Sequence, residues 1–265
     1  MKKLTYLLSF LLLGSIHAQD NAPEGDDLSL AKSSQNPLGN LISVPFEFNG
    51  TPDMGTENNN SYTLNIKPVV PMSLGDDLTL INRFIIPVNY QESLYPDQGS
   101  DQGIGNITYQ GLFSPKPTKS GIIYGGGPVI QAPSNSNDRF GGDSWAGGLA
   151  VVVLAKPGNW LFGCLGQHLQ DFAGGDNVSQ SSFQYFVNYN FENFYLTSTP
   201  TMVYDWTAKD SDDSTLIPVG GGVGKLFHFG KTPVDIRFQT FWNVERPDDV
   251  GSYTAQLSVK FLFPK

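Results

Sequence analysis

Twelve stretches of this chain alternate between apolar and polar residues, and the connectors between them alternate between long and short. A strand whose side chains point to opposite faces in turn has this period of two. In the last stretch, Tyr253, Leu257 and Phe261 share one face, and Thr254 and Lys260 share the other. A barrel that spans a membrane needs such strands, because one face meets lipid and the other meets a lumen. We therefore predict an all-β fold: an antiparallel twelve-stranded transmembrane β-barrel with a short N-terminal helix.

The connectors support this fold because they are sorted by length. The predicted strands cover residues 42–49, 62–73, 78–90, 104–114, 121–132, 145–155, 160–170, 182–190, 194–206, 216–227, 232–244 and 253–263. Six long acidic connectors are predicted at residues 50–61, 91–103, 133–143, 171–180, 207–214 and 245–252. Five short turns separate them, at residues 74–77, 115–120, 156–159, 191–193 and 228–231. This alternation predicts that both termini lie at the short-turn side, the periplasm in an outer-membrane barrel.

A secreted β-sandwich is the alternative fold, since it also has alternating strands joined by glycine- and proline-rich turns. Aromatic residues near strand ends favour the barrel, because membrane girdles lie at the headgroup level: Trp145, Trp160, Trp206, Trp242, Tyr62, Tyr90, Tyr189, Tyr204 and Tyr253. Prolines within predicted strands argue the other way, because proline donates no ladder hydrogen bond: Pro45, Pro68, Pro71, Pro87, Pro128, Pro200, Pro218 and Pro233. We expect these to be bulges, strand ends or positions whose partner faces water.

The N-terminus has the three parts of a signal peptide. Lys2 and Lys3 precede an apolar run at residues 4–13, and Ala18 provides a small residue for cleavage. Residues 1–18 are therefore predicted to be removed. No later run approaches the roughly 18–20 apolar residues that a membrane helix requires.

A polar segment follows before the first strand. Asp26 and Asp27 are expected to cap a short helix at residues 28–35, which Asn36 and Pro37 end. We expect residues 19–40 to form a periplasmic stub or a plug in the barrel mouth, and residues 41–265 to form the barrel.

Net charge limits the partners. The formal charge is -9, from 25 acidic and 16 basic residues, which argues against nucleic acid. The expected partners are outer-membrane lipid and lipopolysaccharide, a small-molecule solute, and the barrel-assembly machinery during biogenesis. The acidic cluster of Asp210, Asp212 and Asp213 either binds divalent cations that bridge lipopolysaccharide or is a solvated surface. No cofactor or metal site is predicted.

Enzymatic patterns are weak. Cys164 is the only cysteine and lacks a matching His and Asn or Asp arrangement. Outer-membrane phospholipases place a serine two residues after their histidine, but here Gln170 follows His168 at that spacing. The glycine-rich run at residues 219–225 precedes Leu226, where a phosphate loop needs Ser or Thr. We predict no catalytic residue and no enzyme.

The candidate functional residues are polar side chains on the predicted inner face of the barrel. A charge on the lipid face near the midplane costs about 2–4 kcal/mol, so strand parity turns such residues inward. The predicted pore-lining residues are Glu47, Lys67, Arg83, Gln110, Asp235, Arg237 and Gln239; Gln256 and Lys260 follow the same parity. One hypothesis is a constriction in which the three basic residues of this set, partly offset by its two acids, orient solutes. The other is a salt-bridged structural filling with no open path.

Four segments carry a resemblance to a known family: residues 34–46, 65–71, 125–131 and 261–265. They resemble bacterial outer-membrane barrels described as transporters, which are related to the phenol-degradation meta-pathway barrel family and sometimes carry a neuromedin U label. The resemblance implies a channel for small or hydrophobic compounds but supplies no binding residues. One departure is that Pro264 and Lys265 follow Phe263, whereas many such barrels end on an aromatic residue.

These observations predict a protein of the bacterial outer membrane. The leading function is a channel or transporter for small solutes, including hydrophobic or aromatic ones. The alternative is a non-conducting structural or surface-binding barrel, and an outer-membrane hydrolase is a distant third.

Overall fold

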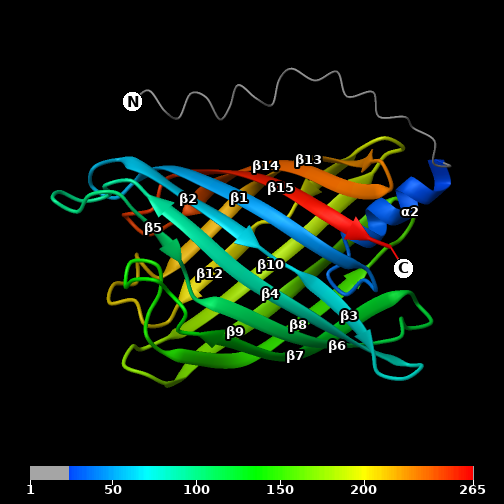
Figure 1. Ribbon diagram of the computed structural model, residues 1–265, viewed down its shortest axis with the longest axis horizontal. Coiled ribbons are helices and arrows are strands. Elements are labelled where there is room, and N and C mark those ends of the chain that lie inside the picture. Colours follow the sequence, from blue (N-terminus) through cyan, green and yellow to red (C-terminus); the bar gives the residue numbers. More distant parts are fainter. Residues whose placement is uncertain (1–23, 265) are drawn as a thin grey trace.

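The computed structural model describes residues 24–264, which form one closed antiparallel barrel of twelve strands (Figure 1). The prediction of a twelve-stranded barrel with a short N-terminal helix is confirmed; the predicted signal peptide lies outside the described residues. Nine barrel strands are continuous: β1 (Ile42–Met54), β4 (Leu78–Gln91), β7 (Ile122–Ala132), β8 (Trp145–Ala155), β9 (Trp160–Ala173), β10 (Ser179–Asn190), β13 (Thr215–Phe229), β14 (Thr232–Glu245) and β15 (Tyr253–Phe263). The barrel closes where β1 pairs with β15, from Ile42 opposite Phe263 to Gly50 opposite Ala255.

The other three barrel strands are interrupted. They are β2 (Asn59–Ile66) with β3 (Val69–Ser73), β5 (Asp101–Ile104) with β6 (Ile107–Pro115), and β11 (Tyr195–Ser198) with β12 (Thr201–Asp205). Pro68 lies in the first interruption and Pro200 in the third, because proline has no N–H for the ladder. Pro218 lies at a shift of register between β13 and β14, as expected for a bulge. Pro45 donates no hydrogen bond to the ladder, but its carbonyl accepts one from the Lys67 N–H at 2.9 Å.

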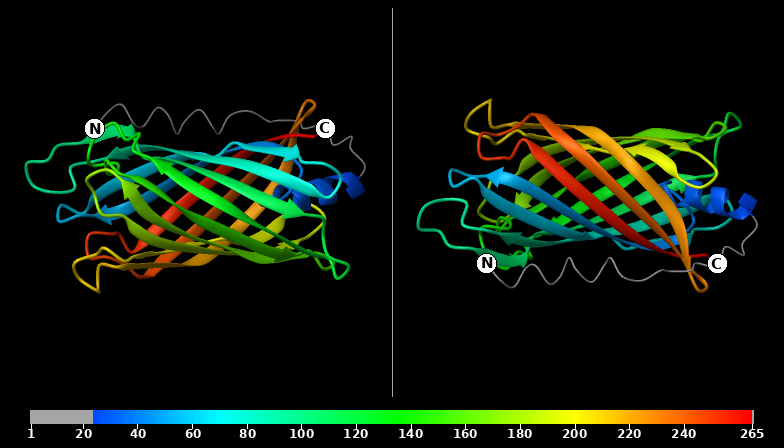
Figure 2. Two further views of the ribbon diagram at one scale, coloured as in Figure 1. Left: turned by 90° about the horizontal axis from the view of Figure 1, so that it is seen from below. Right: turned by 90° about the horizontal axis from the view of Figure 1, so that it is seen from above.

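The two ends of the barrel differ as predicted. Figure 2 shows the long connectors at one end, the loop end, and helix α2 (Glu24–Ser34) at the other, the turn end, where the described chain also finishes. The predicted loops at residues 50–61 and 171–180 are wrong in length. Strands β1 and β2 continue pairing as far as Met54 and Asn59, and β9 runs to Ala173 while β10 begins at Ser179. Helix α2 also begins earlier than predicted, so Asp26 and Asp27 lie within it and not before it.

Hydrogen bonds between loops shape the loop end. Tyr95 donates from its hydroxyl to the Asp249 carboxylate at 2.7 Å, and Gly55 donates from its backbone to the Asp249 carbonyl at 2.8 Å. The Asp249 carboxylate, together with partial burial, raises the pKa of Tyr95 to about 12. These bonds join the connection between β14 and β15 to the connection between β1 and β2 and to the one between β4 and β5.

Apolar side chains cover the outside of the wall. Leu149 and Val151, in the middle of β8, are 67% and 63% exposed, which a water-soluble domain would avoid in a continuous belt. The four tryptophans are exposed at or near strand ends: Trp145, Trp160, Trp206 and Trp242. The exposed apolar belt and the tryptophans near the strand ends give the outer surface the character of a transmembrane barrel. The described residues contain no helix with the length and hydropathy of a membrane span.

The interior has two unlike halves. Inner-face residues of β4 and β6 to β10 form a buried apolar cluster: Ile81, Leu112, Ile123, Val129, Ala146, Ala150, Val152, Leu154, Leu161, Leu165, Leu169 and Phe186, joined by Leu38. The expectation of a polar inner face is therefore wrong for this half, where strands such as β8 are apolar on both faces. The charged residues gather on the other half.

Candidate functional site

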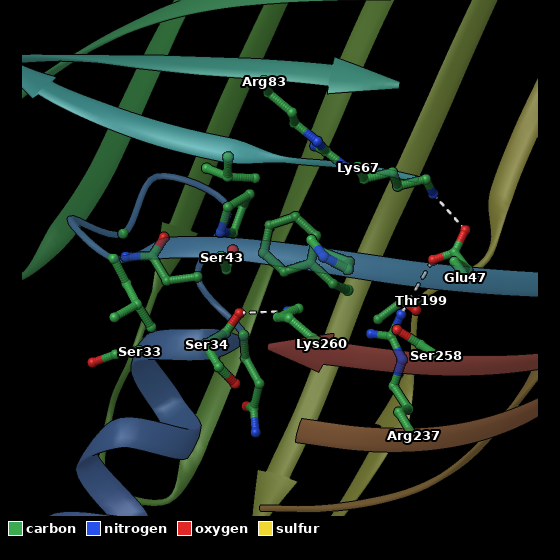
Figure 3. A pocket seen from close by; sticks show the side chains of 18 of the residues that line it. Ser33, Ser34, Ser43, Glu47, Lys67, Arg83, Thr199, Arg237, Ser258 and Lys260 are labelled. Carbon is green, nitrogen blue, oxygen red and sulfur yellow. Dashed lines mark hydrogen bonds and ion pairs between the residues drawn. The ribbon is translucent and has the colours of Figure 1, made fainter. Parts of the chain in front are cut away.

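Six charged side chains meet on the inner face of neighbouring strands. We call them the charge cluster: Glu47 on β1, Lys67 after β2, Arg83 on β4, Asp235 and Arg237 on β14, and Lys260 on β15. Figure 3 shows all of them except Asp235. The closure of β1 on β15 brings residues from both ends of the barrel sequence together. Asp235 lies opposite Lys260 in the ladder, and Lys260 lies opposite Pro45.

Glu47 is shared by two basic residues. Its carboxylate forms ion pairs with Lys67 and, at 3.5 Å between Oε2 and Nη2, with Arg237. The Glu47 side chain is only 12% exposed, so the pairs are screened less than pairs in bulk water. Arg83 lies nearby but forms no ion pair with Glu47. The Glu47 carboxylate therefore balances the charges of Lys67 and Arg237 at once, with Arg83 close by.

Asp235 is held by hydroxyl groups. Its two carboxylate oxygens accept hydrogen bonds from Ser34 Oγ at 2.8 Å and from Tyr195 Oη at 2.7 Å. Tyr195 fits there because Gly224, on the adjacent strand, has no side chain; a Cβ at that position would overlap the Tyr195 ring. Lys260 donates to the backbone carbonyl of Ser34 at 2.7 Å. The ladder neighbours Asp235 and Lys260 thus both hold the N-terminal segment.

Arg83 differs from the other members. Among residues 24–264, its guanidinium has no hydrogen-bond or ion-pair partner, although its five N–H groups are obligatory donors. The buried Nε of Arg237 also has no acceptor within the described chain. Unmatched donors of this kind are costly inside a protein, so the site has unused capacity to bind an anion.

A cavity of about 110 Å³ lies beside these donors. Residues of the charge cluster line it together with Phe186 and Thr199, and the segment at residues 33–41 borders it next to helix α2. Such a volume holds several water molecules or one small solute.

The N-terminal segment is anchored at four further points. Gln35 exchanges side-chain hydrogen bonds with Asn190 at 2.7 and 3.2 Å, and Lys32 donates to the Gly158 carbonyl at 2.7 Å. Leu38 is buried within the apolar cluster, against Gly125 of β7. The Asp27 carboxylate of α2 lies 3.5 Å from His228 Nε2, near the end of β13. Helix α2 and the segment after it are thus attached to several strands around the mouth.

The seven predicted pore-lining residues all lie on the inner face, but they separate into two groups. Glu47, Lys67, Arg83 and Arg237 line the cavity. The remaining three are buried and hydrogen-bonded to other side chains. Gln110 donates to Gln167, Asp235 accepts from Ser34 and Tyr195, and Gln239 forms hydrogen bonds with Thr199 and Gln256. Ser34 and Tyr195 were missed, because no local pattern links either residue to Asp235.

Buried amides compensate for the strand break at Pro200. The Oε1 atom of Gln239 accepts from the Thr199 N–H at 3.1 Å, and Gln184 donates to the Thr199 carbonyl at 3.1 Å. These bonds satisfy backbone groups that the interrupted ladder leaves free. Gln239 and Gln184 therefore have a structural role.

His168 lies on the outer face, away from the cavity. Its Nδ1 is 3.0 Å from Ser181 Oγ, which also accepts a hydrogen bond from Trp206 Nε1 at 2.9 Å. In the described part of the chain, no carboxylate or amide holds the second ring nitrogen, as a hydrolytic triad requires. No group of three potential metal ligands occurs there either. The pair belongs to the polar rim near the loop end.

Comparison with known proteins identifies the fold. No protein-family model matches the sequence, and no curated protein matches it. A crystal structure of an outer membrane channel from Pseudomonas putida F1 superposes with a TM-score of 0.64 at 17% identity, covering 86% of this chain and 97% of that one. An outer membrane phospholipase from Salmonella typhi gives 0.45 at 13% identity, with 92% and 99% covered. A FadL homologue from Pseudomonas aeruginosa gives 0.46 at 9% identity, with 88% and 93% covered. The chain therefore has the fold of outer-membrane β-barrel proteins.

Proposed function

We propose that this barrel is a channel for small solutes, whose path runs along the lumen past the charge cluster. The observation that carries this proposal is the cavity beside Arg83, whose guanidinium has no hydrogen-bond or ion-pair partner among the described residues. The segment at residues 33–41 is the plug, which narrows the path at the turn end. A solute passes when the plug shifts away from Asp235 and Lys260, which hold it through Ser34.

The apolar half of the lumen supports hydrophobic or aromatic solutes. Phe186 faces the cavity, and the apolar cluster continues from it along β9 and β8. Residues 34–46 and 125–131 resemble outer-membrane transporters that are related to the phenol-degradation barrel family, which agrees with this solute class. A purely polar pore would carry polar side chains around the whole wall.

A non-conducting barrel is the second candidate, and one observation favours it. The apolar cluster fills half of the interior with side chains of negligible exposure, including Ile81, Leu112 and Val152. In that case the charge cluster serves only to fill the remaining half. The two functions differ in whether ions cross the protein.

Single-channel recording in planar bilayers is expected to distinguish them. We expect the full chain to give small, intermittent currents. Replacing Ser34, Gln35 and Leu38 together by alanine is expected to raise the open probability about tenfold or more, because it removes a hydrogen bond to a charged group and a buried leucine.

The matched control replaces three exposed residues of the short turns by alanine: Lys119, Glu192 and Lys231. Its currents are expected to equal those of the unmodified chain. Silence in both the unmodified and the plug-loosened protein, with heat-modifiable folding intact, would contradict a channel and favour the non-conducting barrel.

A further inference from the structure

We infer that the charge cluster and its cavity form a binding site for one small carboxylate with an apolar body. The inference deepens the proposed function and rests on it, since the bound molecule would be a solute on its way through the lumen. It follows from three features of the site: its charge balance, its unused donors and its two unlike walls.

The charge balance favours an anion. Four cationic side chains face two carboxylates, Glu47 and Asp235, within the cluster. Glu47 is already shared by Lys67 and Arg237, and both oxygens of Asp235 are taken by hydroxyl groups. An uncompensated positive charge in a poorly solvated interior is unfavourable, so an entering anion would be attracted and a cation repelled.

The unused donors favour a carboxylate in particular. Arg83 presents a planar fork of N–H groups that no described residue accepts, and Nε of Arg237 is buried without an acceptor. A guanidinium binds a carboxylate through two parallel, charge-assisted hydrogen bonds. Figure 3 shows that Arg83 approaches the cavity from β4, on the far side of Lys67 from the Glu47 carboxylate.

The second wall selects the body of the ligand. It consists of Phe186 of β10, which is 5% exposed, and of Val69, which lies opposite Arg83 in the β3–β4 ladder and packs against the same apolar cluster. An anion with oxygens on all sides, such as sulfate, would leave some of them without partners against this wall. A carboxylate with an apolar body satisfies both walls at once.

The test compares benzoate with benzamide, its uncharged isostere, and with acetate, which lacks the apolar body. Each is titrated by calorimetry into the full-length, detergent-solubilised protein, with empty micelles as the blank. We expect benzoate to bind about tenfold or more tightly than either comparator. Arg83→Gln is expected to weaken benzoate about tenfold while leaving benzamide unchanged.

Arg246→Gln is the matched control, because it removes one arginine from an exposed connection at the loop end. Benzoate binding by this variant should equal that of the unmodified protein, and the heat-modifiability shift should show that Arg83→Gln folds. Absence of benzoate binding, equal affinity for benzoate and benzamide, or an unaffected Arg83→Gln variant would overturn the carboxylate site. If acetate binds as tightly as benzoate, the claim that the site selects a ligand with an apolar body is overturned.

The experiments distinguish failure of the carboxylate site from failure of the channel. The titration involves no flux, so a barrel that carries no current can still bind benzoate. Conversely, a barrel that conducts without binding benzoate keeps its channel function and loses only this inference.

Discussion

Replacing Glu47 by glutamine is expected to lower the free energy of unfolding by about 3–5 kcal/mol, the range for removing one partner of a buried ion pair. Glu47 pairs with both Lys67 and Arg237, whose side chains are 17% and 19% exposed. Without its charge, these two cations and Arg83 repel one another in a poorly solvated interior. Urea unfolding in phospholipid vesicles, followed by tryptophan fluorescence, measures the change.

Glu57→Gln is the matched control, because Glu57 is exposed in the turn between β1 and β2. A surface change of this kind alters stability by at most about 0.5 kcal/mol. The double variant of Glu47→Gln with Lys67→Met should recover part of the loss, since it removes one of the unpaired charges. Equal unfolding midpoints for the Glu47 and Glu57 variants would show that the cluster is well solvated and that Glu47 does not hold it together.

Replacing Val151 by arginine is expected to lower the free energy of unfolding by about 2–4 kcal/mol, the cost of a charge on the lipid face near the bilayer midplane. Val151 lies in the middle of β8, points outward and is 63% exposed. In a water-soluble barrel, the same substitution at an exposed position would change stability little. The vesicle unfolding experiment therefore tests where the hydrocarbon lies.

Val244→Arg provides the depth control for this substitution. Val244 is 57% exposed, faces outward and lies one residue before the end of β14, at the loop end. An arginine near the interface costs only about 0–1 kcal/mol, because its side chain reaches the headgroups. Similar losses at both positions would mean that the middle of β8 is not surrounded by hydrocarbon.

Much of the architecture is local and was therefore predictable. The period of two located all twelve barrel strands, since alternation is a property of successive residues in one strand. The same parity placed Lys67, Arg83 and Arg237 on the inner face, where the structure has them. The strand ends are less predictable. Polar residues such as Thr51 and Asn60 belong to β1 and β2, although the sequence pattern predicts a loop at residues 50–61.

The arrangement of the interior depends on contacts between distant parts of the chain. Strand β8 is apolar on both faces, so its alternation does not show that Ala150 and Val152 face a dry interior. No periodicity indicates that Ser34 reaches Asp235, 201 positions away, or that Tyr195 occupies the space left by Gly224. These contacts exist only because closure of β1 on β15 brings the first and last strands together.

The sequence by itself determined a closed wall of twelve membrane-spanning strands and which side chains point inward, because both follow from residue order along single strands. Only the tertiary structure decided that the inward charges gather on one half of the lumen, that Arg83 has no hydrogen-bond or ion-pair partner in the described part of the chain, and that the N-terminal segment borders the cavity. The physical reason is that ion pairing, burial and cavity shape depend on which strands face each other across the barrel, and strand alternation carries no information about that.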